Sequence, residues 1–556
     1  MAKHPAAALK EAVVCFRQGR LDQAEKISAR ILKERPGNFD ALHLLGIIKL
    51  QSGKPVAALG FFESALKANP DSPEVLGHLA MALVGLRRDD EALGLLNRAQ
   101  AIDPNGWHTL NNRGILLARL DRASEALADF DRALAIEPRN LGIALNRGNA
   151  LSKLGRLAEA LAQYDAVLSA QPSLAEAHQN RGNALFGLGR VAESLAAFDR
   201  ALALRRDYPK ALSSRAMALQ GLNRHREAIA DLDRALAIEP NNADAHHDAS
   251  LALLRLGDYR RGFEEYEWRW RRTEMPGPRN LGKPLWLGEY PLACKTILLH
   301  AEQGLGDSIQ FVRYAPILAR AGARVLLEAP LELTALLGRV EGIAAVLAAG
   351  DPLPVFDVHC PLGSLPRALR TKPTNIPAVV PYLKPSDQKI AAWRARLADI
   401  SSPRIAIAWS GNARHPNDRN RSIALSLLEP ILSLDQFNVL SIQRELRQED
   451  VELFARLPQL THLGQDLADF DDTSAVVSLV DVVISVDTSV AHLAGALGRP
   501  TWILLPFGPD WRWKLDREDS PWYPTARLFR QPALGDWSSV IARVQHELID
   551  CAGGKP

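Results

Sequence analysis

A repeat of about 34 residues organises the first half of the chain and constrains its fold more than any other feature. A small residue recurs at this interval, at Gly46, Ala80, Gly114, Gly148, Gly182 and Ala216. A second small residue follows twelve positions later, at Ala58, Ala92, Ala126, Ala160, Ser194 and Ala228. Prolines close most units, at Pro36, Pro70, Pro104, Pro138, Pro172 and Pro240, with Arg206 as the exception. Because small residues let two helices approach closely and proline ends a helix, the pattern predicts stacked helical hairpins.

An aromatic residue recurs on the second helix of several units, where it is expected to fill the gap between units. The positions are Phe62, Phe130, Tyr164, Phe198 and Tyr266. Together these phased positions resemble the tetratricopeptide repeat family. About eight units are expected between Pro5 and Pro276, with Ser250 and Gly262 at the small positions of a degenerate last unit. The sequence therefore predicts an α-solenoid over residues 1–276.

Asparagines keep the same phase through the middle of this solenoid. Asn112, Asn146 and Asn180 occupy one position of the repeat, and Asn149 and Asn183 occupy another. Stacked amides offer both donors and an acceptor to the backbone of an extended peptide, which favours a peptide groove that recruits a protein or glycan partner. Asparagine is also common at these positions for structural reasons alone, so both interpretations stay open.

The stretch from Tyr266 to Arg272 (YEWRWRR) ends the repeats and is rich in aromatic and basic residues. Tryptophans at helical spacing with arginines between them favour a packed junction with the next domain. Binding of nucleic acid or of a membrane is the alternative.

The second half alternates short apolar strands with helices, which predicts α/β architecture with parallel sheets. Expected strands include 296–301 and 324–329, and then 404–409, 439–442, 482–486 and 501–505 after proline-rich punctuation at 373–385. Helices are expected at 308–321 and about 388–399. We expect two lobes, residues 277–385 and 386–556, with ligands beyond the carboxyl ends of the strands.

Two glycines and an aspartate follow the first of these strands. Gly304 and Gly306 permit a tight turn and close approach by a ligand, so they mark a candidate acceptor loop. Asp307 has two possible roles: it can cap the following helix, or it can point into the cleft as a general base.

A polar and basic loop follows the strand at 404–409. Gly411 and Asn412 open it, and Arg421 and Ser422 close it, with Arg414 and Arg419 between them. Arginine forms bidentate contacts with phosphate oxygens, so this loop suits a diphosphate, although a solvated surface loop is the plain alternative.

A third motif joins the strand at 482–486 to a helix rich in small residues. Thr488 and Ser489 supply hydroxyls beside the positive end of this helix, which favours an anionic ligand. Asp487 would repel a phosphate and is assigned a sugar or ribose hydroxyl instead. His492 is interpreted either as a buried hydrogen-bonded histidine or as a ligand contact.

These loops carry a second resemblance, over about residues 295–534. Gly304 to Asp307 and the run from Asp487 to Pro500 (DTSVAHLAGALGRP) resemble the heptosyltransferase-like glycosyltransferases, whose GT-B fold has two Rossmann-like lobes. The resemblance implies Asp307 as catalytic base, and a nucleotide-diphosphate sugar bound by the C-terminal lobe. Arg421-Ser422 stands where the family usually has lysine, and Ser489 where it usually has glycine. The layout of repeats before such a half is also similar to protein O-linked N-acetylglucosamine transferases.

Composition excludes several classes of protein. The 67 basic and 64 acidic residues nearly balance, to a formal net charge of +3, which argues against a dedicated nucleic-acid binder. The four cysteines (Cys15, Cys294, Cys360, Cys551) show no CxxC spacing and fit a reducing compartment. No apolar run reaches the length of a membrane span, so a cytoplasmic location is expected.

The sequence thus predicts an inverting, metal-independent glycosyltransferase that needs no cofactor besides its nucleotide-sugar co-substrate. The donor would be bound by Gly411, Asn412, Arg421, Ser422, Asp487, Thr488, Ser489 and His492. The alternative is a catalytically inactive repeat scaffold that carries a GT-B-like domain and binds proteins.

Overall fold

The computed structural model describes residues 5–273, 277–415, 417–454, 456–457 and 459–552. The chain divides into two compact units, Met1–Ser214 and Arg215–Pro556. This boundary lies within the repeats, because the last repeats pack more extensively against the α/β half than against the earlier repeats. The expected boundaries near 276 and 385 follow the sequence pattern and stay a prediction.

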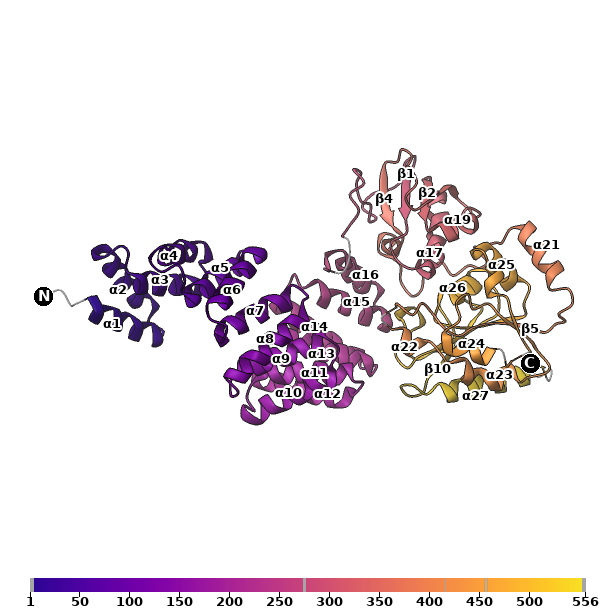
Figure 1. The fold of residues 1–556 in the computed structure, drawn as a ribbon. Helices are drawn as coiled ribbons and strands as arrows, with labels where there is room; N and C mark the ends of the chain where they lie inside the picture. Colours follow the sequence, from indigo (N-terminus) through magenta and orange to yellow (C-terminus); the bar gives the residue numbers. More distant parts are fainter. Residues whose placement is uncertain (1–4, 274–276, 416, 455, 458, 553–556) are drawn as a thin grey trace. The chain divides into compact units, whose positions relative to one another are not determined.

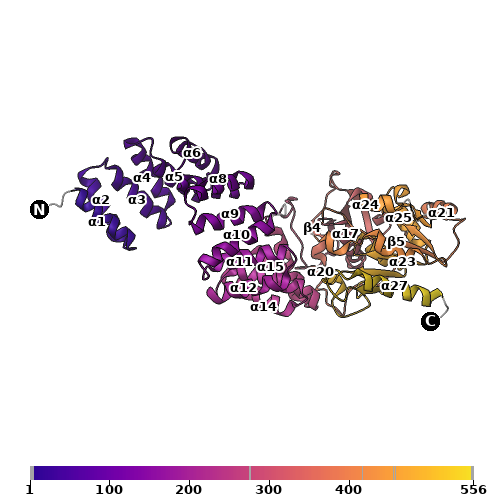
Figure 2. The ribbon, with the colours of Figure 1, turned by 60° about the horizontal axis from the view of Figure 1, so that its bottom comes forward.

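Unit 1 is an α-solenoid in which consecutive helices lie side by side in pairs (Figure 1, Figure 2). The helices are α1 (Pro5–Arg17), α2 (Leu21–Glu34), α3 (Phe39–Gln51), α4 (Pro55–Ala68), α5 (Pro73–Gly85), α6 (Asp89–Ile102), α7 (Trp107–Arg119), α8 (Ala123–Ile136), α9 (Leu141–Lys153), α10 (Leu157–Ala170), α11 (Ala175–Gly187) and α12 (Val191–Leu204). Helix α13 (Pro209–Gly221) spans the boundary between the units. The repeat phase thus predicted the hairpins correctly.

The recurring glycine and the recurring aromatic residue pack directly on each other within a hairpin. A Cβ added at Gly148 would lie 2.5 Å from Cε1 of Tyr164, and one added at Gly182 would lie 2.4 Å from Cε1 of Phe198. The aromatic ring therefore fills the space that the missing side chain leaves inside its own unit. The sequence pattern led us to expect the ring in the gap between units, and the structure adds this contact inside the unit.

The contact between Gly148 and Tyr164 predicts that a methyl group added at position 148 lowers the stability of unit 1. Gly148→Ala should lower the free energy of unfolding of unit 1 by about 1–3 kcal/mol, because the Tyr164 ring is buried and cannot yield freely. Gly60→Ala is the matched control: it also lies in a helix but has no atom within 4 Å of an added Cβ, so it should be neutral or slightly stabilising. Urea denaturation followed by circular dichroism measures both. Equal stability of the two variants would contradict the packing argument.

Unit 2 begins with the last helices of the solenoid and continues into two parallel sheets. The helices are α14 (His225–Ile238), α15 (Ala243–Leu256) and α16 (Tyr259–Tyr266), followed by the 3-10 turn η1 (Glu267–Arg271). With these, the solenoid described by the structure runs from α1 to α16.

The first sheet has four parallel strands in the order β3-β2-β1-β4. They are β1 (Thr296–His300), β2 (Arg324–Ala329), β3 (Ile343–Ala348) and β4 (Val358–Pro361). Helices α17 (Leu305–Phe311), α18 (Ala315–Arg320), α19 (Leu331–Leu337) and α20 (Leu365–Ala368) connect or follow them, with η2 (Val312–Tyr314) and η3 (Leu362–Ser364). The strand order reverses between β1 and β4, and such a switch point is where α/β sheets bind ligands.

The second sheet has six parallel strands in the order β10-β9-β8-β5-β6-β7. They are β5 (Arg404–Ala408), β6 (Asn438–Ser441), β7 (Leu460–His462), β8 (Val482–Val486), β9 (Thr501–Leu505) and β10 (Ala526–Arg530). The accompanying helices are α21 (Asp387–Arg396), α22 (Asp418–Arg421), α23 (Glu429–Leu432), α24 (Gln448–Phe454), α25 (Phe470–Ser478), α26 (Ser489–Ala496) and α27 (Trp537–Ala552), with 3-10 turns η4 (Leu425–Leu428), η5 (Gly464–Asp466) and η6 (Trp511–Trp513). This is the doubly wound order of nucleotide-binding sheets, with its switch point between β5 and β8.

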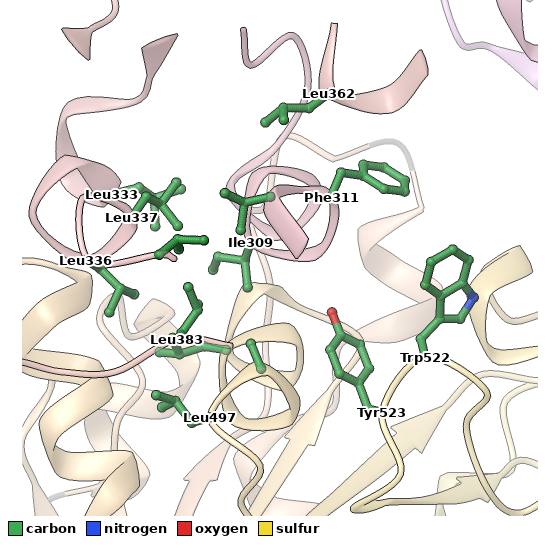
Figure 3. Packing of buried hydrophobic residues seen from close by; sticks show 14 of the residues in the cluster. Ile309, Phe311, Leu333, Leu336, Leu337, Leu362, Leu383, Leu497, Trp522 and Tyr523 are labelled. Carbon is green, nitrogen blue, oxygen red and sulfur yellow. The ribbon is translucent and has the colours of Figure 1, made fainter. Parts of the chain in front are cut away.

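One hydrophobic core joins the elements around both sheets of unit 2. Figure 3 shows Ile309 of α17 and Leu336 of α19 on one side of this core, facing Leu383, Leu497 and Tyr523 on the other. Contacts across this core bring the loops at the carboxyl ends of the strands together: Asp307 after β1 pairs with Arg512 after β9, and Arg421 after β5 contacts Asp487 after β8.

Four strands escaped the sequence analysis: β3, β4, β7 and β10. Two of them, β4 and β7, have only three or four residues, β3 is only partly buried, and β10 (ARLFR) has two arginines among its five residues, so none gives a strong apolar signal. The helix expected at 308–321 is also interrupted, because η2 separates α17 from α18 just before Pro316. In the described part of the chain, no helix is long and apolar enough to span a bilayer.

Candidate functional site

Asp307 lies at the start of α17 and uses its two oxygens for different partners. Its Oδ2 accepts the Gly304 N–H at 3.1 Å, which caps the helix, and its Oδ1 forms an ion pair with Arg512. Burial raises the pKa of the Asp307 carboxyl, while Arg512 opposes that rise. The structure confirms the capping role of Asp307, and its role as a general base stays a prediction, because the second oxygen is paired with Arg512.

Arg512 lies in η6, in the loop that follows β9 of the second sheet. From the sequence, the run Trp511-Arg512-Trp513 either lines an acceptor site or closes the domain core, and no pairing of Arg512 with Asp307 was expected. Arg512 is 8% exposed, and it also pairs with Asp510 at 2.9 Å and donates to the side chain of Gln310. Its position after a buried strand was the available signal. The neighbouring Trp511 and Trp513 are buried, which favours the second of these roles, closing the domain core.

The loop after β8 places Thr488 and Ser489 at the start of α26. Thr488 is the N-cap residue but makes no capping hydrogen bond, and its Oγ1 lies 3.2 Å from Oγ of Ser485. The first amides of a helix lack intrahelical partners, so this end can receive an anion. Burial and the nearby Asp510 raise the pKa of Asp487 to about 6, and Arg512 and Arg421 oppose the shift.

His492 is a buried, neutral histidine. Its Nδ1 lies 2.9 Å from the Tyr523 hydroxyl, its ring stacks on Trp513, and burial lowers its pKa to about 3. A Cβ added at Gly306 would lie 2.8 Å from its Cδ2, so Gly306 lets α17 pack against α26. Of the two interpretations of His492, the structure favours the hydrogen-bonded core residue.

The loop after β5 is organised around Gly411. Its N–H donates to Ser422 Oγ at 3.1 Å, and that hydroxyl donates to Asp418 at 2.7 Å. Arg421 donates from Nη1 to the backbone oxygen of Asp487 at 3.0 Å, and its buried Nε has no hydrogen-bond partner in the described structure. A side chain at position 411 would collide with the Arg421 guanidinium, 2.6 Å from an added Cβ. The hydrogen bond from Arg421 to the backbone oxygen of Asp487 joins the loops after β5 and β8, on the two sides of the switch point.

Asn412 lies at the exposed end of the same loop. Its Oδ1 accepts the Arg414 N–H at 2.9 Å, which stabilises the turn. Asn412 therefore lies in the same loop as Gly411, Arg421 and Ser422, and its side-chain hydrogen bond goes to the backbone of Arg414.

The predicted groove asparagines lie in unit 1, on helices α7, α9 and α11. The amide of Asn146 donates to Asn111 at 3.0 Å, and that of Asn180 donates to Asn149 at 2.8 Å. Asn112 is half-buried beside Gly77. Asn146 and Asn180 thus link one repeat to the next, which favours the structural interpretation at these two positions, and the peptide groove stays a prediction.

Among the described residues, no group of three or more metal-binding side chains is close enough to hold a metal ion. The site combines the half-buried carboxylate of Asp307, which is paired with Arg512, with the guanidinium of Arg421 and the N-terminus of α26. Such a set can accept a proton and bind an anionic ligand.

Comparisons with known proteins identify the repeats. Models of the tetratricopeptide repeat match residues 49–111, 108–136, 145–210 and 214–267. Protein FlbA of Caulobacter vibrioides is 28% identical over 334 residues, which are 54% of this chain and 54% of that protein, so the match spans about half the length of this relative.

Solved structures with repeats of this type are also similar to the chain. A tetratricopeptide repeat protein of Parabacteroides merdae is 20% identical, with a TM-score of 0.38, and covers 45% of this chain and 98% of its own. A thermophilic TPR protein of Thermus thermophilus is 27% identical, with a TM-score of 0.30, and covers 33% and 100%. The matched models and the paired helices together show that the helical part of the chain consists of tetratricopeptide repeats.

Proposed function

We propose that the chain is an inverting glycosyltransferase that transfers a sugar from a nucleotide-diphosphate sugar to an acceptor hydroxyl, with a GT-B arrangement of its two sheets. One observation carries the proposal: the loops after β1, β5, β8 and β9 meet at the carboxyl ends of both sheets. The ion pair between Asp307 and Arg512 joins the two sides of this region.

Asp307 is the proposed base. Arg512 favours its ionised form, which a base requires, while burial makes the carboxylate more basic than an exposed one. In the reaction Asp307 accepts the proton of the acceptor hydroxyl as the oxygen attacks the anomeric carbon. The bond from that carbon to the diphosphate breaks in the same step, which inverts the configuration.

The second sheet is the proposed donor side. Arg421 and the first amides of α26 would stabilise the negative charge that develops on the leaving diphosphate, with hydroxyl donors from Thr488 and Ser489. Asp487 is unsuited to a phosphate and is assigned to a sugar or ribose hydroxyl. No cofactor is required for this step, and the repeats recruit the acceptor, a protein or a glycan-bearing partner.

Calorimetry with a panel of nucleoside diphosphates and nucleotide sugars tests the donor side. Arg421→Met should weaken binding about 10- to 100-fold, because it removes a charge-assisted contact to phosphate in a partly buried site. Arg414→Met removes the same charge from the exposed end of the same loop and should change affinity less than threefold. Thermal melting checks that both variants are folded. Equal effects of the two substitutions would remove Arg421 from the donor site.

The alternative is a protein-binding scaffold that has lost catalysis. Two internal contacts favour this alternative, because they occupy groups that the substrates would need. Arg421 already donates to the backbone oxygen of Asp487, and Asp307 already forms an ion pair with Arg512. The tetratricopeptide repeats favour a protein partner under either proposal. An inactive scaffold should release no heat with any nucleotide in the same titrations.

A further inference from the structure

The switch point of the first sheet contains a side chain from the repeats. Arg269 of η1 is 1% exposed, and its Nη2 donates to Glu302 at 2.7 Å and to Ser364 at 2.8 Å. Glu302 follows β1 and Ser364 follows β4, the two strands between which the strand order reverses. The guanidinium therefore lies where α/β sheets usually admit a ligand. Glu267 pairs with the same guanidinium at 2.9 Å and helps to offset the cost of burying it.

A second contact from the last repeat reaches the loop that carries Asp307. The hydroxyl of Tyr266 accepts a hydrogen bond from the side-chain amide of Gln303. Most other repeats have phenylalanine or no aromatic residue at the position of Tyr266, so this hydroxyl is a departure from the repeat pattern. The departure occurs where the repeat meets the loop between β1 and α17.

The same repeat also holds the loop that carries Arg512. Arg255 of α15 donates from Nε to the backbone oxygen of Pro509 at 3.0 Å, and Lys514 donates to the backbone oxygen of Leu254 at 2.7 Å. The Trp511 ring packs edge-on against Tyr259 and Phe263 of α16. One repeat thus contacts both loops on either side of the ion pair between Asp307 and Arg512.

We infer that the last repeat, residues 243–271, is a positioning element of the site, with Tyr266 and Arg269 as the positioning residues for the loop of Asp307. Here polar and ionic groups reach specific atoms of the two loops, which fixes their positions relative to each other. The catalytic consequence rests on the proposed glycosyltransferase function, whereas the positioning of the loops does not.

Tyr266→Phe in the full chain is the sharpest test, because Arg269→Met would leave Glu302 buried without its partner and risks misfolding. The substitution keeps the ring and restores the residue found in several other repeats. Tyr164→Phe is the matched control: Tyr164 occupies the same repeat position in unit 1, and its hydroxyl bonds to Asn149 there.

Amide hydrogen exchange provides a readout that does not depend on activity. Exchange over residues 302–311 should be about three- to tenfold faster in Tyr266→Phe than in the wild type, because loss of one hydrogen bond makes local opening easier. It should be unchanged in Tyr164→Phe, and thermal melting checks that both variants are folded. Equal exchange over 302–311 in the two variants would overturn the inference.

Transfer kinetics provide the catalytic readout once a donor has been identified. Tyr266→Phe should lower kcat about three- to tenfold with an unchanged Kd for the donor, since the donor loops are untouched. An unchanged kcat in an active enzyme would overturn the catalytic part of the inference while the proposed function stands. Faster exchange in a chain that transfers no sugar would support the positioning and contradict only the proposed function.

Discussion

Asp307→Asn is expected to lower the rate of sugar transfer by about 10²- to 10⁴-fold, the usual contribution of a general base. Asparagine keeps an oxygen that can accept the Gly304 N–H, so the cap of α17 is preserved, but it cannot take a proton from the acceptor. Affinity for the donor should stay within about threefold of the wild type, because the donor loops belong to the other sheet. Initial rates with saturating donor, together with calorimetry, measure the two effects separately.

Asp357→Asn is the control for that substitution. Asp357 also accepts a backbone N–H, from Thr296 at 2.7 Å, and it is exposed beside the opposite end of β1. Its replacement should leave transfer within about twofold of the wild type. If Asp307→Asn retains near-wild-type transfer, Asp307 is not the base. If it abolishes donor binding as well, its effect is structural.

Arg512→Met is expected to have the largest effect on stability, about 3–5 kcal/mol of the free energy of unfolding of unit 2. It removes a buried cation and leaves Asp307 and Asp510 without their shared partner. Of the 11 tryptophans, all except Trp107 lie in unit 2, so denaturation followed by tryptophan fluorescence reports mainly on this unit. Arg517→Met breaks an exposed pair with Asp519 and should cost less than about 1 kcal/mol. Equal losses in the two variants would contradict the assignment of Arg512 as the central contact.

The same substitution has a consequence for pH dependence. Arg512 lowers the pKa of Asp307, so its removal should raise that pKa and protonate more of the base at a given pH. Any transfer that survives in a folded Arg512→Met protein should therefore rise over a higher pH range than in the wild type. A rate profile against pH measures the shift, and a profile that moves to lower pH would contradict the pairing.

The repeats were predictable because their determinants are local. Glycine and an aromatic residue sixteen positions later, as in Gly148 and Tyr164, specify one hairpin at a time, and each proline ends a unit. The long buried strands were predictable for the same reason. The short or partly buried strands β4, β7 and β3 were missed, because their neighbours in the sheet make them strands.

The site was only partly predictable. The loops after β1, β5 and β8 were found, because glycines, hydroxyls and arginines follow clear apolar strands. Arg512 was missed as a partner of Asp307, because 205 residues separate the two and only the packing of the two sheets brings them together. The role of Tyr266 was missed for a similar reason, since its partner Gln303 lies beyond the end of the repeats. Charged and amide side chains that form contacts between distant segments follow no periodic pattern in the sequence, so the sequence alone does not reveal these pairs.

A crystal structure of the full chain with a nucleotide sugar bound tests the central claim most directly. The account predicts the diphosphate within hydrogen-bond distance of Arg421 and the first amides of α26, with the anomeric carbon on the side that faces Asp307. A nucleotide sugar bound away from the loops after β5 and β8, or a diphosphate that contacts neither Arg421 nor α26, would contradict it.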